Sequence, residues 1–453
     1  MIRKSILIAA AIAPLFLLEL FVLEKVYSTN PPPTSPPGAL LAGRSGGSSN
    51  RVQQSGTSMV EKGTARSIQS ASQVETTRLL GQAEPETKEA FLRLIAAESI
   101  THRARKDGNW NDPAVWGGRV PGPAARVHVP EGLKVRIEGA GTEHLDALLI
   151  DGDLEIVPSF DTTLHVDTLI VNEMGALRAG SLEHPVPGDR NVLISLEALF
   201  PPGEPADLRA ESARLVSMGE LSLHGEPKTG MAMLASLPQA GAREILLTAA
   251  PYNWRPDDLV VLGGNLETRE ERPAFQVEEV NGNRVRLTPA DPTIVDWKGL
   301  ETSFETNRDQ LGFVVNLTRN VAVSSPDRDD PVAPNGSILI MGGTGVARTS
   351  LTHVGSYGLG VGDMVLEGSD EAINRPALSL AGDAGSGGAV LEGLVVVDAP
   401  AGNLNIDPGV SPVRDSVSYD EQGGALLSEN GHPSRLVWSS TRTSRGVTAL
   451  GGY

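Results

Sequence analysis

The sequence predicts an all-β protein whose strands coil into a parallel solenoid. Short apolar or alternating segments recur along the chain, and Gly, Pro, Asp or Asn closes each one. Gly132, Gly152 and Gly175 stand 20 and 23 residues apart, which is the length that one stacked coil requires. No helical stripe of useful length follows Ala97. An open sandwich has similar strand spacing, so the period favours the solenoid without deciding it.

Composition narrows the class of protein. Gly 50 and Pro 32 make up about 18% of the 453 residues, against a usual 12%, which fits many turns. The formal net charge of −18 lacks the basic footprint of nucleic-acid binding, so we expect no nucleic-acid partner. The absence of cysteine excludes disulfides, thiolate metal sites and a cysteine nucleophile. It fits a bacterial envelope or extracellular protein better than a secreted animal protein.

Residues 1–28 have the anatomy of an export signal. Arg3 and Lys4 precede an apolar run from Ile6 to Leu18, and a small residue, Ser28, ends an acceptable cleavage site. The segment is either a cleaved signal peptide or an uncleaved anchor, which would be the only contact with a membrane. Glu19 argues against the anchor, because a carboxylate in hydrocarbon is costly. We therefore expect an exported protein, periplasmic, surface-bound or extracellular.

Two connecting segments follow. Residues 29–84 are rich in Pro, Ser and Gly and are predicted to be a disordered linker. Residues 85–104 are predicted to hold one short helix, because Phe91, Leu94 and Ile95 follow helical spacing. We expect this helix to cap the start of the core.

The strand-like segments define two regions. Residues 105–230 are expected to form a β-rich domain with the segments RVHVP, LKVRI, ALLI, DLEIV, TLHVDTLIV and ALRAG. Residues 231–453 are expected to form a parallel β-helix, with segments such as GSILIMG, ARTSLTHV, PALSLAG, AVLEGLVVVDAP and NLNID. Parallel strands of a solenoid are short apolar runs, because one face lines the interior.

Several ordered motifs resemble the eight-glycine (G-eight) domain family, whose members include fibrocystin, the cell-migration-inducing hyaluronan-binding protein and a transmembrane hyaluronidase. They are WNDPAVW, VPG, VPEGLKV, LLIDGDLEI, GALRAG, LSLHGEPKTG, WRPDDLVVL and NLTRNVAV. The candidates for the eight glycines are Gly118, Gly122, Gly132, Gly152, Gly175, Gly180, Gly219 and Gly225. The resemblance implies a β-rich domain that leads into a right-handed parallel β-helix.

The resemblance also bears on catalysis. Hyaluronan-cleaving members carry a Tyr-Pro-x-His-x-His segment, and the matching place here is Arg375–Ala381. Pro376 is kept, but the segment has no histidine and no His-x-His occurs anywhere in the chain. Histidine is the usual proton carrier near neutral pH, so this departure argues against the family's hydrolase activity.

Ligand-binding candidates are few. Trp110, Trp116 and Arg119 share one short loop, where aromatic rings and a guanidinium can contact a sugar; alternatively, both tryptophans plug the end of the solenoid. His224 and His353 lie at strand ends, where a structural hydrogen bond competes with a ligand-binding role. The chain is therefore predicted to bind a polysaccharide or matrix polymer without cleaving it. The alternatives are a hyaluronan-like polysaccharide hydrolase or lyase, and a structural adhesin or stalk.

No cofactor is predicted, because the dispersed histidines lack metal-ligand spacing. Asp151 with Asp153, and Asp257 with Asp258, are the paired carboxylates that glycoside chemistry would need; Asx turns explain them as well. The loop cluster Asp327, Asp329 and Asp330 is a weak calcium candidate. The glycine-rich segment 342–345 lacks a phosphate-binding lysine and is predicted to be a turn.

Overall fold

A computed structural model describes residues 91–92, 95, 97–139, 142–198, 213–239, 241–263, 274–290, 299–300, 312–325, 335–365, 372–381, 388–397, 404–405, 413–419, 426–428 and 448–449. The expected signal segment (1–28) and linker (29–84) lie outside these residues. Within them, no helix is long and apolar enough to span a membrane.

Fifteen strands form one large sheet, called sheet A, and all its pairs are parallel except β29 with β30. Its strands are β1 (His102–Arg103), β3 (Arg126–Val129), β5 (Leu145–Ile150), β7 (Thr162–Val171), β9 (Val192–Leu196), β10 (Arg214–Ser217), β18 (Val321–Ser324), β19 (Ser337–Met341), β21 (Val354–Tyr357), β24 (Leu378–Ala381), β26 (Val395–Val397), β27 (Leu404–Asn405), β29 (Ser416–Tyr419), β30 (Leu426–Ser428) and β31 (Thr448–Ala449).

Strand β7 divides sheet A into two sides. Its first half pairs with β9 and its second half with β5 and β10. The first side therefore runs β1-β3-β5-β7-β10-β19-β24-β27, and the second side runs β7-β9-β18-β21-β26-β29.

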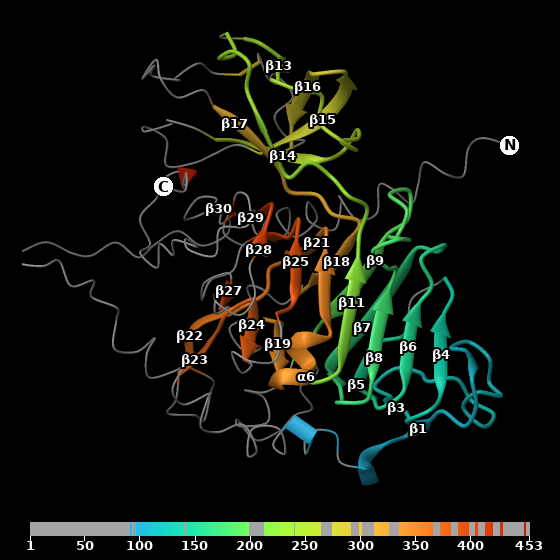
Figure 1. Cartoon of the computed structure of the whole chain (residues 1–453). Helices are drawn as coiled ribbons and strands as arrows, with labels where there is room; N and C mark the ends of the chain where they lie inside the picture. Colours follow the sequence, from blue (N-terminus) through green and yellow to red (C-terminus); the bar gives the residue numbers. More distant parts are fainter. Residues whose placement is uncertain are drawn as a thin grey trace, which may run out of the picture. The chain divides into compact units, whose positions relative to one another are not determined.

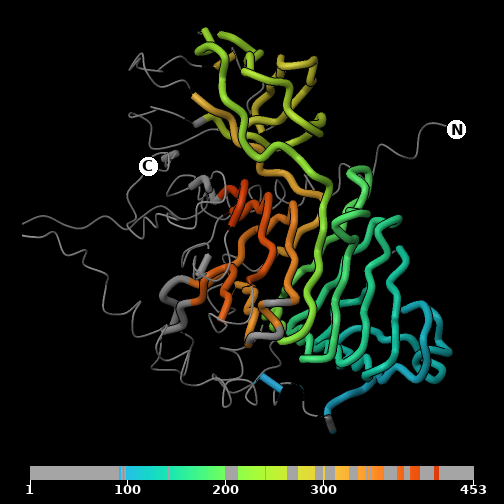
Figure 2. The backbone as a smooth tube through the Cα atoms, viewed as in Figure 1, coloured from blue at the N-terminus to red at the C-terminus, as the bar shows by residue number. Residues whose placement is uncertain are grey.

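Eight parallel strands form a separate sheet, sheet B, in which β4, β6, β8 and β11 lie side by side (Figure 1). Its strands are β2 (Gly108–Asn109), β4 (Lys134–Ile137), β6 (Asp153–Ile156), β8 (Ala176–Ala179), β11 (Glu220–His224), β20 (Thr349–Thr352), β25 (Val390–Glu392) and β28 (Val413–Arg414). The chain visits the two sides of sheet A and then sheet B in turn, which makes a three-sided solenoid whose coils Figure 2 traces. This arrangement confirms the predicted fold class and excludes the open sandwich.

The interior is filled by alternate residues of each strand. Leu154 pairs with Leu177, Leu177 pairs with Leu221, and all three side chains are fully buried. Burying one such side chain stabilises the fold by about 1.5–3 kcal/mol. The predicted period is also confirmed, because Lys134, Asp153 and Ala176 are register partners on successive coils.

Glycines are required where the coils turn from sheet A into sheet B. A Cβ added to Gly152 would lie 2.2 Å from the carbonyl oxygen of Pro130, and one added to Gly175 would lie 2.0 Å from that of Ile150. On the next coil, a Cβ added to Gly219 would lie 2.2 Å from the carbonyl oxygen of Asn172. Stacked backbones come this close only where no side chain separates them. The spacing of these glycines therefore follows from coil stacking.

The N-terminal segment lies on the flank of the solenoid. Phe91 and Ile95 pack against Ala147, Ile170 and Val216, which face outward on the first side of sheet A. A short 3-10 helix, η1, covers Ala97–Ser99, and strand β1 already begins at His102. The prediction that this segment caps the start of the core is wrong: its apolar stripe covers strands of several coils from the side.

A six-stranded antiparallel sheet, sheet C, interrupts the solenoid between β11 and β18. Its strands are β12 (Met231–Met233), β13 (Glu244–Leu246), β14 (Leu259–Gly263), β15 (Ala274–Asn281), β16 (Arg284–Pro289) and β17 (Phe313–Asn316). The prediction that residues 231–453 form one uninterrupted parallel β-helix is therefore wrong for 231–316. An alternating apolar pattern does not distinguish parallel from antiparallel partners, although Gly282-Asn283 between β15 and β16 is a hairpin signal.

Two smaller departures follow in the later coils. Segment 342–345, predicted as a turn, begins helix α6 (Gly342–Ala347), which links β19 to β20. Strands β22 (Val361–Val365) and β23 (Ala372–Arg375) form an antiparallel hairpin before β24.

Candidate functional site

The tryptophan loop belongs to the core. Trp110 and Trp116 are only 2% and 5% exposed, and their rings meet edge to face with centroids 4.9 Å apart. The indole Nε1 of Trp116 donates a hydrogen bond to the carbonyl oxygen of Trp110 at 2.6 Å. Arg119 is exposed. The rings are therefore closed to a sugar and belong to the hydrophobic core.

His224 is buried at the end of β11. Its Nδ1 lies 2.8 Å from Thr352 Oγ1 on the next coil, and its Nε2 lies 2.8 Å from Ser222 Oγ. Burial lowers the pKa of His224, so the ring is neutral at physiological pH. Both ring nitrogens are occupied by hydroxyl groups of the solenoid, which makes the role of His224 structural.

His353 lies directly after the Thr352 that bonds His224, in a left-handed conformation with φ 53°. The backbone N–H of Lys228 donates to its Nδ1 at 3.5 Å. Burial, and then the charge of Arg319, lower the pKa of His353 to about 4. The structure thus brings the two predicted histidines close to the same segment, the one that leads from β11 into sheet C.

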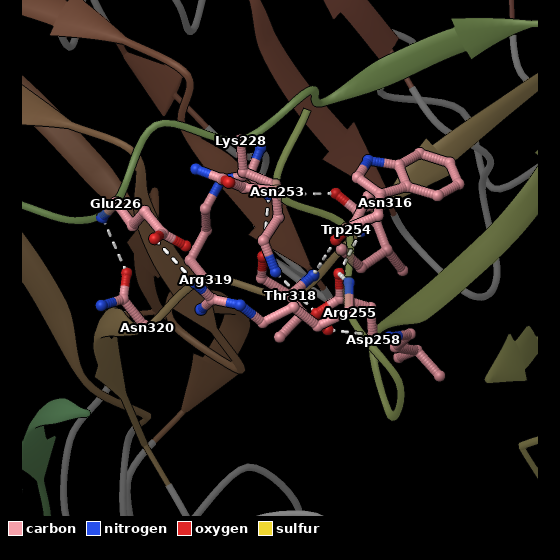
Figure 3. Close-up of polar contacts among 12 residues, drawn as sticks. Glu226, Lys228, Asn253, Trp254, Arg255, Asp258, Asn316, Thr318, Arg319 and Asn320 are labelled. Atoms are coloured by element: carbon pink, nitrogen blue, oxygen red, sulfur yellow. Dashed lines mark hydrogen bonds and ion pairs between the residues drawn. The ribbon is translucent and has the colours of Figure 1, made fainter. Parts of the chain in front are cut away.

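That segment carries a polar cluster that the sequence did not reveal, called here the junction network (Figure 3). Its members are Glu226, Lys228, Arg255, Asp258, Asn316 and Arg319. Lys228 Nζ donates to Asp258 Oδ1 at 2.6 Å, and the two side chains are 7% and 5% exposed. The other oxygen of Asp258 accepts from the amide of Asn316 at 2.8 Å and from the backbone N–H of Arg255 at 3.0 Å.

Burial governs the charges of the junction network. It lowers the pKa of Lys228, while Asp258 acts in the opposite direction. Burial also lowers the pKa of Arg319 to about 10 and raises the pKa of Tyr357 to about 12. Tyr357 O–H donates to the carbonyl oxygen of Leu317 at 2.8 Å. These contacts tie sheet C to β18 and β21 of the solenoid.

The junction network is not fully satisfied. Arg319 donates from Nε to the carbonyl oxygen of Gly393 at 2.9 Å and from Nη1 to that of Thr318 at 2.8 Å. Its Nη2, and Oε2 of Glu226, have no hydrogen-bond partner within the described residues. The Lys228–Asp258 pair lies inside the protein and holds two parts of the chain together, whereas Arg255, which bonds Glu226, is 41% exposed.

The structure also contains two clusters of histidine and carboxylate side chains that were not predicted from the sequence. His128 Nε2 lies 2.7 Å from Asp151 Oδ2, and Asn172 Nδ2 donates to Asp151 Oδ1 at 2.9 Å. The hydrogen bond with His128 is the main reason why the pKa of Asp151 is lowered. The 23-residue and 21-residue separations of these side chains match one coil, a signal that was present in the sequence.

The second cluster surrounds Glu197. His165 Nδ1 lies 3.1 Å from its Oε1 and His144 Nδ1 lies 3.4 Å from its Oε2, while Ser195 Oγ donates at 2.6 Å. The hydrogen bond with His165 leads these contacts, which lower the pKa of Glu197 to about 2. No group of three or more potential ligands among the described residues is arranged to hold a metal ion.

The paired carboxylates do not act as pairs. Asp151 bonds His128, whereas Asp153 bonds Arg178 at 3.0 Å. Asp258 bonds Lys228, and its neighbour Asp257 is exposed in a left-handed turn. The calcium candidate at residues 327–330 lies outside the described residues. In the segment Arg375–Ala381, Arg375 is buried and donates to the carbonyl oxygen of Asn335 at 3.3 Å.

Sheet B carries charged side chains on its outer face, called here the sheet-B ladder. Its members are Lys134, Asp153, Glu155, Arg178, Glu220 and Arg348. Arg178 contacts both Asp153 and Glu220, and Arg348 contacts Glu220 at 3.0 Å. Burial acts to raise the pKa of Glu220, but Arg178 and Arg348 hold it below its usual value. Cations and anions are interspersed, so the ladder has little net field.

The solenoid sides differ in what covers them. The first side of sheet A is covered by Phe91 and Ile95. On the second side, Val395, Val397 and Val417 are covered by apolar side chains of sheet C. Sheet B carries no such apolar cover among the described residues, and the side chains of Lys134 and Arg178 are 46% and 34% exposed. Sheet B is thus an open polar side, and the Glu197 cluster beside β7 and β9 is a smaller polar patch on sheet A.

Comparison with known proteins gives the class. Residues 115–235 match the G8 domain, which confirms the resemblance noted from the sequence. Residues 115–235, about a quarter of the chain, therefore carry a match to the G8 domain within a parallel β-solenoid.

Among individual relatives, fibrocystin from Canis lupus familiaris is 26% identical over 180 residues and fibrocystin from Mus musculus is 27% identical over 182. Each match covers 38% of this chain and 4% of the fibrocystin, so the chain corresponds to a small part of these relatives.

Two solved structures are similar to the chain. The Pseudomonas phage phi297 tailspike gp61 has a TM-score of 0.19 at 11% identity, over 59% of this chain and 50% of its own. The Gp54 tailspike of Acinetobacter baumannii bacteriophage AP22, solved in complex with A. baumannii capsular saccharide, has a TM-score of 0.15 at 10% identity. That match covers 64% of this chain and 47% of the tailspike. These scores are too low to transfer a property of either tailspike.

Proposed function

We propose that this protein binds a carbohydrate or matrix polymer along the outer face of sheet B and does not cleave it. The observation that carries the proposal is that sheet B presents an open ladder of charged side chains over several coils, while apolar packing covers strands on both sides of sheet A. Parallel strands repeat about every 4.8 Å, so the ladder offers donors and acceptors at regular intervals to a repeating ligand.

The chemistry of the ladder suits a ligand rich in hydroxyl groups. Guanidinium groups donate in a planar fork and carboxylates accept, so Arg178 with Glu220 can bond neighbouring hydroxyl groups. The near balance of charge, and the chain's net charge of −18, argue against a contact driven mainly by the charge of a polyanion.

Binding is tested with the purified full chain on immobilised hyaluronan, polygalacturonate and dextran. We expect at least one of these polymers to retain the protein. Replacing Lys134, Arg178 and Arg348 together by Ala should weaken retention at least tenfold, as expected when several interface contacts are truncated. Arg284→Ala is the matched control. Arg284 lies in sheet C, and its Nη1 lies 2.6 Å from Oε1 of Glu244 in an exposed ion pair that is not part of sheet B.

Incubation of the protein with the same three polymers in solution tests the alternative function, a hydrolase or lyase. The pair His128–Asp151 favours that alternative, because it joins an imidazole to a carboxylate beside the sheet-B ladder. Size-exclusion chromatography of the incubated polymers should show unchanged chain lengths. Shortened products that His128→Gln abolishes would establish the enzyme instead. Lack of retention on all three polymers, together with self-association, would favour the structural adhesin.

We also propose that the protein is exported, either secreted or held at the cell surface. The support is the basic start followed by the apolar run Ile6–Leu18. N-terminal sequencing of the protein from fractionated bacterial cells distinguishes a mature chain that begins after Ser28 from a full-length chain in the membrane. Recovery of the full-length chain in the cytoplasm would refute export.

A further inference from the structure

An exposed aromatic ring lies in the loop between strands β13 and β14. Tyr252 is 62% exposed, and Phe160, at 42%, is the other exposed aromatic among the described large hydrophobic residues. Single exposed hydrophobic residues are common and need no explanation by themselves. Tyr252 differs from other exposed hydrophobic residues in two respects: hydrogen bonds fix its loop, and Arg255 of the same loop forms a partly exposed ion pair.

The loop of Tyr252 is fixed by hydrogen bonds to the segment that leaves β11. The N–H of Tyr252 donates to Thr229 Oγ1 at 2.8 Å, and the N–H of Thr229 donates to the carbonyl oxygen of Tyr252 at 3.1 Å. Asn253, with φ 57°, donates from Nδ2 to the carbonyl oxygen of Pro227 at 2.9 Å. The ring is thus presented from a backbone that is already ordered, which lowers the entropic cost of a contact.

Trp254, two residues after Tyr252, anchors the same loop. Trp254, labelled in Figure 3, is 6% exposed, and its Nε1 donates to the carbonyl oxygen of Thr229 at 2.7 Å. The two neighbouring aromatic residues therefore have opposite roles: Trp254 is buried and holds the loop, whereas Tyr252 faces solvent.

An ion pair lies three residues further along. Arg255 Nη2 donates to Glu226 Oε1 at 2.7 Å, and the two side chains are 41% and 19% exposed. Glu226 follows His224, the last residue of β11, by two positions. Tyr252 and Arg255 therefore belong to one loop, and this loop is bonded to the segment that directly follows sheet-B strand β11.

We propose that Tyr252 is a stacking platform for one pyranose ring of a bound polymer, with the pair Arg255–Glu226 bonding the hydroxyl groups of that sugar. The inference rests on the proposed polymer-binding function and adds a subsite to it. A pyranose ring has an apolar C–H face and a polar rim, which matches an aromatic ring beside a paired donor and acceptor. This is the arrangement expected at Trp110, Trp116 and Arg119 from the sequence, and the structure provides it at a different loop.

The test compares the full chain with Tyr252→Ala, Tyr252→Trp and Phe160→Ala on immobilised hyaluronan, polygalacturonate and dextran. On whichever polymer the unmodified chain binds most tightly, Tyr252→Ala should weaken binding about tenfold, as loss of an aromatic anchor does. Tyr252→Trp should retain binding, because the larger ring still stacks. Phe160→Ala should change binding less than twofold, which controls for the loss of an exposed ring as such.

Three results separate the subsite from the function on which it rests. Unchanged binding by Tyr252→Ala, with a clear effect of the Lys134, Arg178 and Arg348 replacement, would overturn the subsite and leave the proposed function standing. No binding of any of the three polymers by the unmodified chain would overturn both. A loss in Tyr252→Ala that Tyr252→Trp does not restore would attribute the effect to the loop and overturn the stacking role.

Discussion

The two ion pairs Lys228–Asp258 and Arg178–Glu220 have similar chemistry and different surroundings. Their shortest oxygen–nitrogen distances are 2.6 and 2.5 Å. The first pair is 7% and 5% exposed in the junction network, and the second is 34% and 22% exposed on sheet B. Burial makes the first pair structural, because neither charge can return to water. The second pair remains open to exchange its partner for a ligand.

The comparison is tested most strongly by Lys228→Ala. Removing the ammonium leaves Asp258 charged and buried, which should lower the free energy of unfolding by about 3–5 kcal/mol. Urea denaturation followed by circular dichroism measures the change. The double replacement of Lys228 by Met and Asp258 by Asn should recover most of the loss, since it removes both charges and keeps an acceptor for Asn316 and the Arg255 N–H. A loss below about 1 kcal/mol would show that the pair behaves like an exposed one.

The next effect concerns pH and His353. The pKa of His353 is about 4 in the folded protein and 6.5 for a free histidine side chain. Between these two pH values the unfolded chain therefore binds more protons than the folded chain. Stability should therefore fall as the pH drops from about 6.5 to 4, by up to about 3 kcal/mol. His353→Asn should flatten this dependence, and asparagine tolerates the positive φ of this position. Equal pH slopes in both proteins, from urea midpoints at several pH values, would contradict the buried neutral imidazole.

A smaller loss is expected from Asn316→Ala. Asn316 is fully buried and donates from its amide to Asp258 Oδ2, so its removal leaves the carboxylate with one donor fewer. We expect a loss of about 2 kcal/mol, measured by thermal unfolding. Thr318→Ala is a suitable control, since it removes a hydrogen bond to the N–H of Leu259 and leaves Asp258 untouched. An equal loss in both variants would mean that the carboxylate is not the reason.

The smallest effect is expected from Arg178→Ala. An exposed ion pair contributes little to folding, so stability should change by less than about 1 kcal/mol although three carboxylate contacts disappear. Thermal unfolding at low and high salt checks this. A loss of several kcal/mol would mean that the sheet-B ladder is part of the fold and would weaken its assignment as a binding face.

The early coils could be predicted from the sequence because their information is local. The segments that contain β3 to β8 alternate or are wholly apolar, and the glycines at their corners recur at the length of one coil. Sheet C could not be predicted in the same way. Its strands have the same alternation, and only their partners, brought together by the tertiary fold, make them antiparallel.

The candidate site was harder to predict than the fold. The sequence placed aromatic rings and a guanidinium at Trp110, Trp116 and Arg119, but a tryptophan fits a core and a surface equally well. Burial decided the matter in favour of the core. The same residue types at Tyr252 and Arg255 became a candidate only when exposure and loop anchoring were known.

By itself, the sequence determined the class of fold, the length of a coil and the G8 domain, because strand alternation and turn glycines act between near neighbours. Tertiary structure alone decided which charges are buried and which face stays open. Lys228 meets Asp258 thirty positions away, and His224 meets Thr352 across 128 positions. Such contacts depend on how whole coils stack, and no local pattern of residues records that.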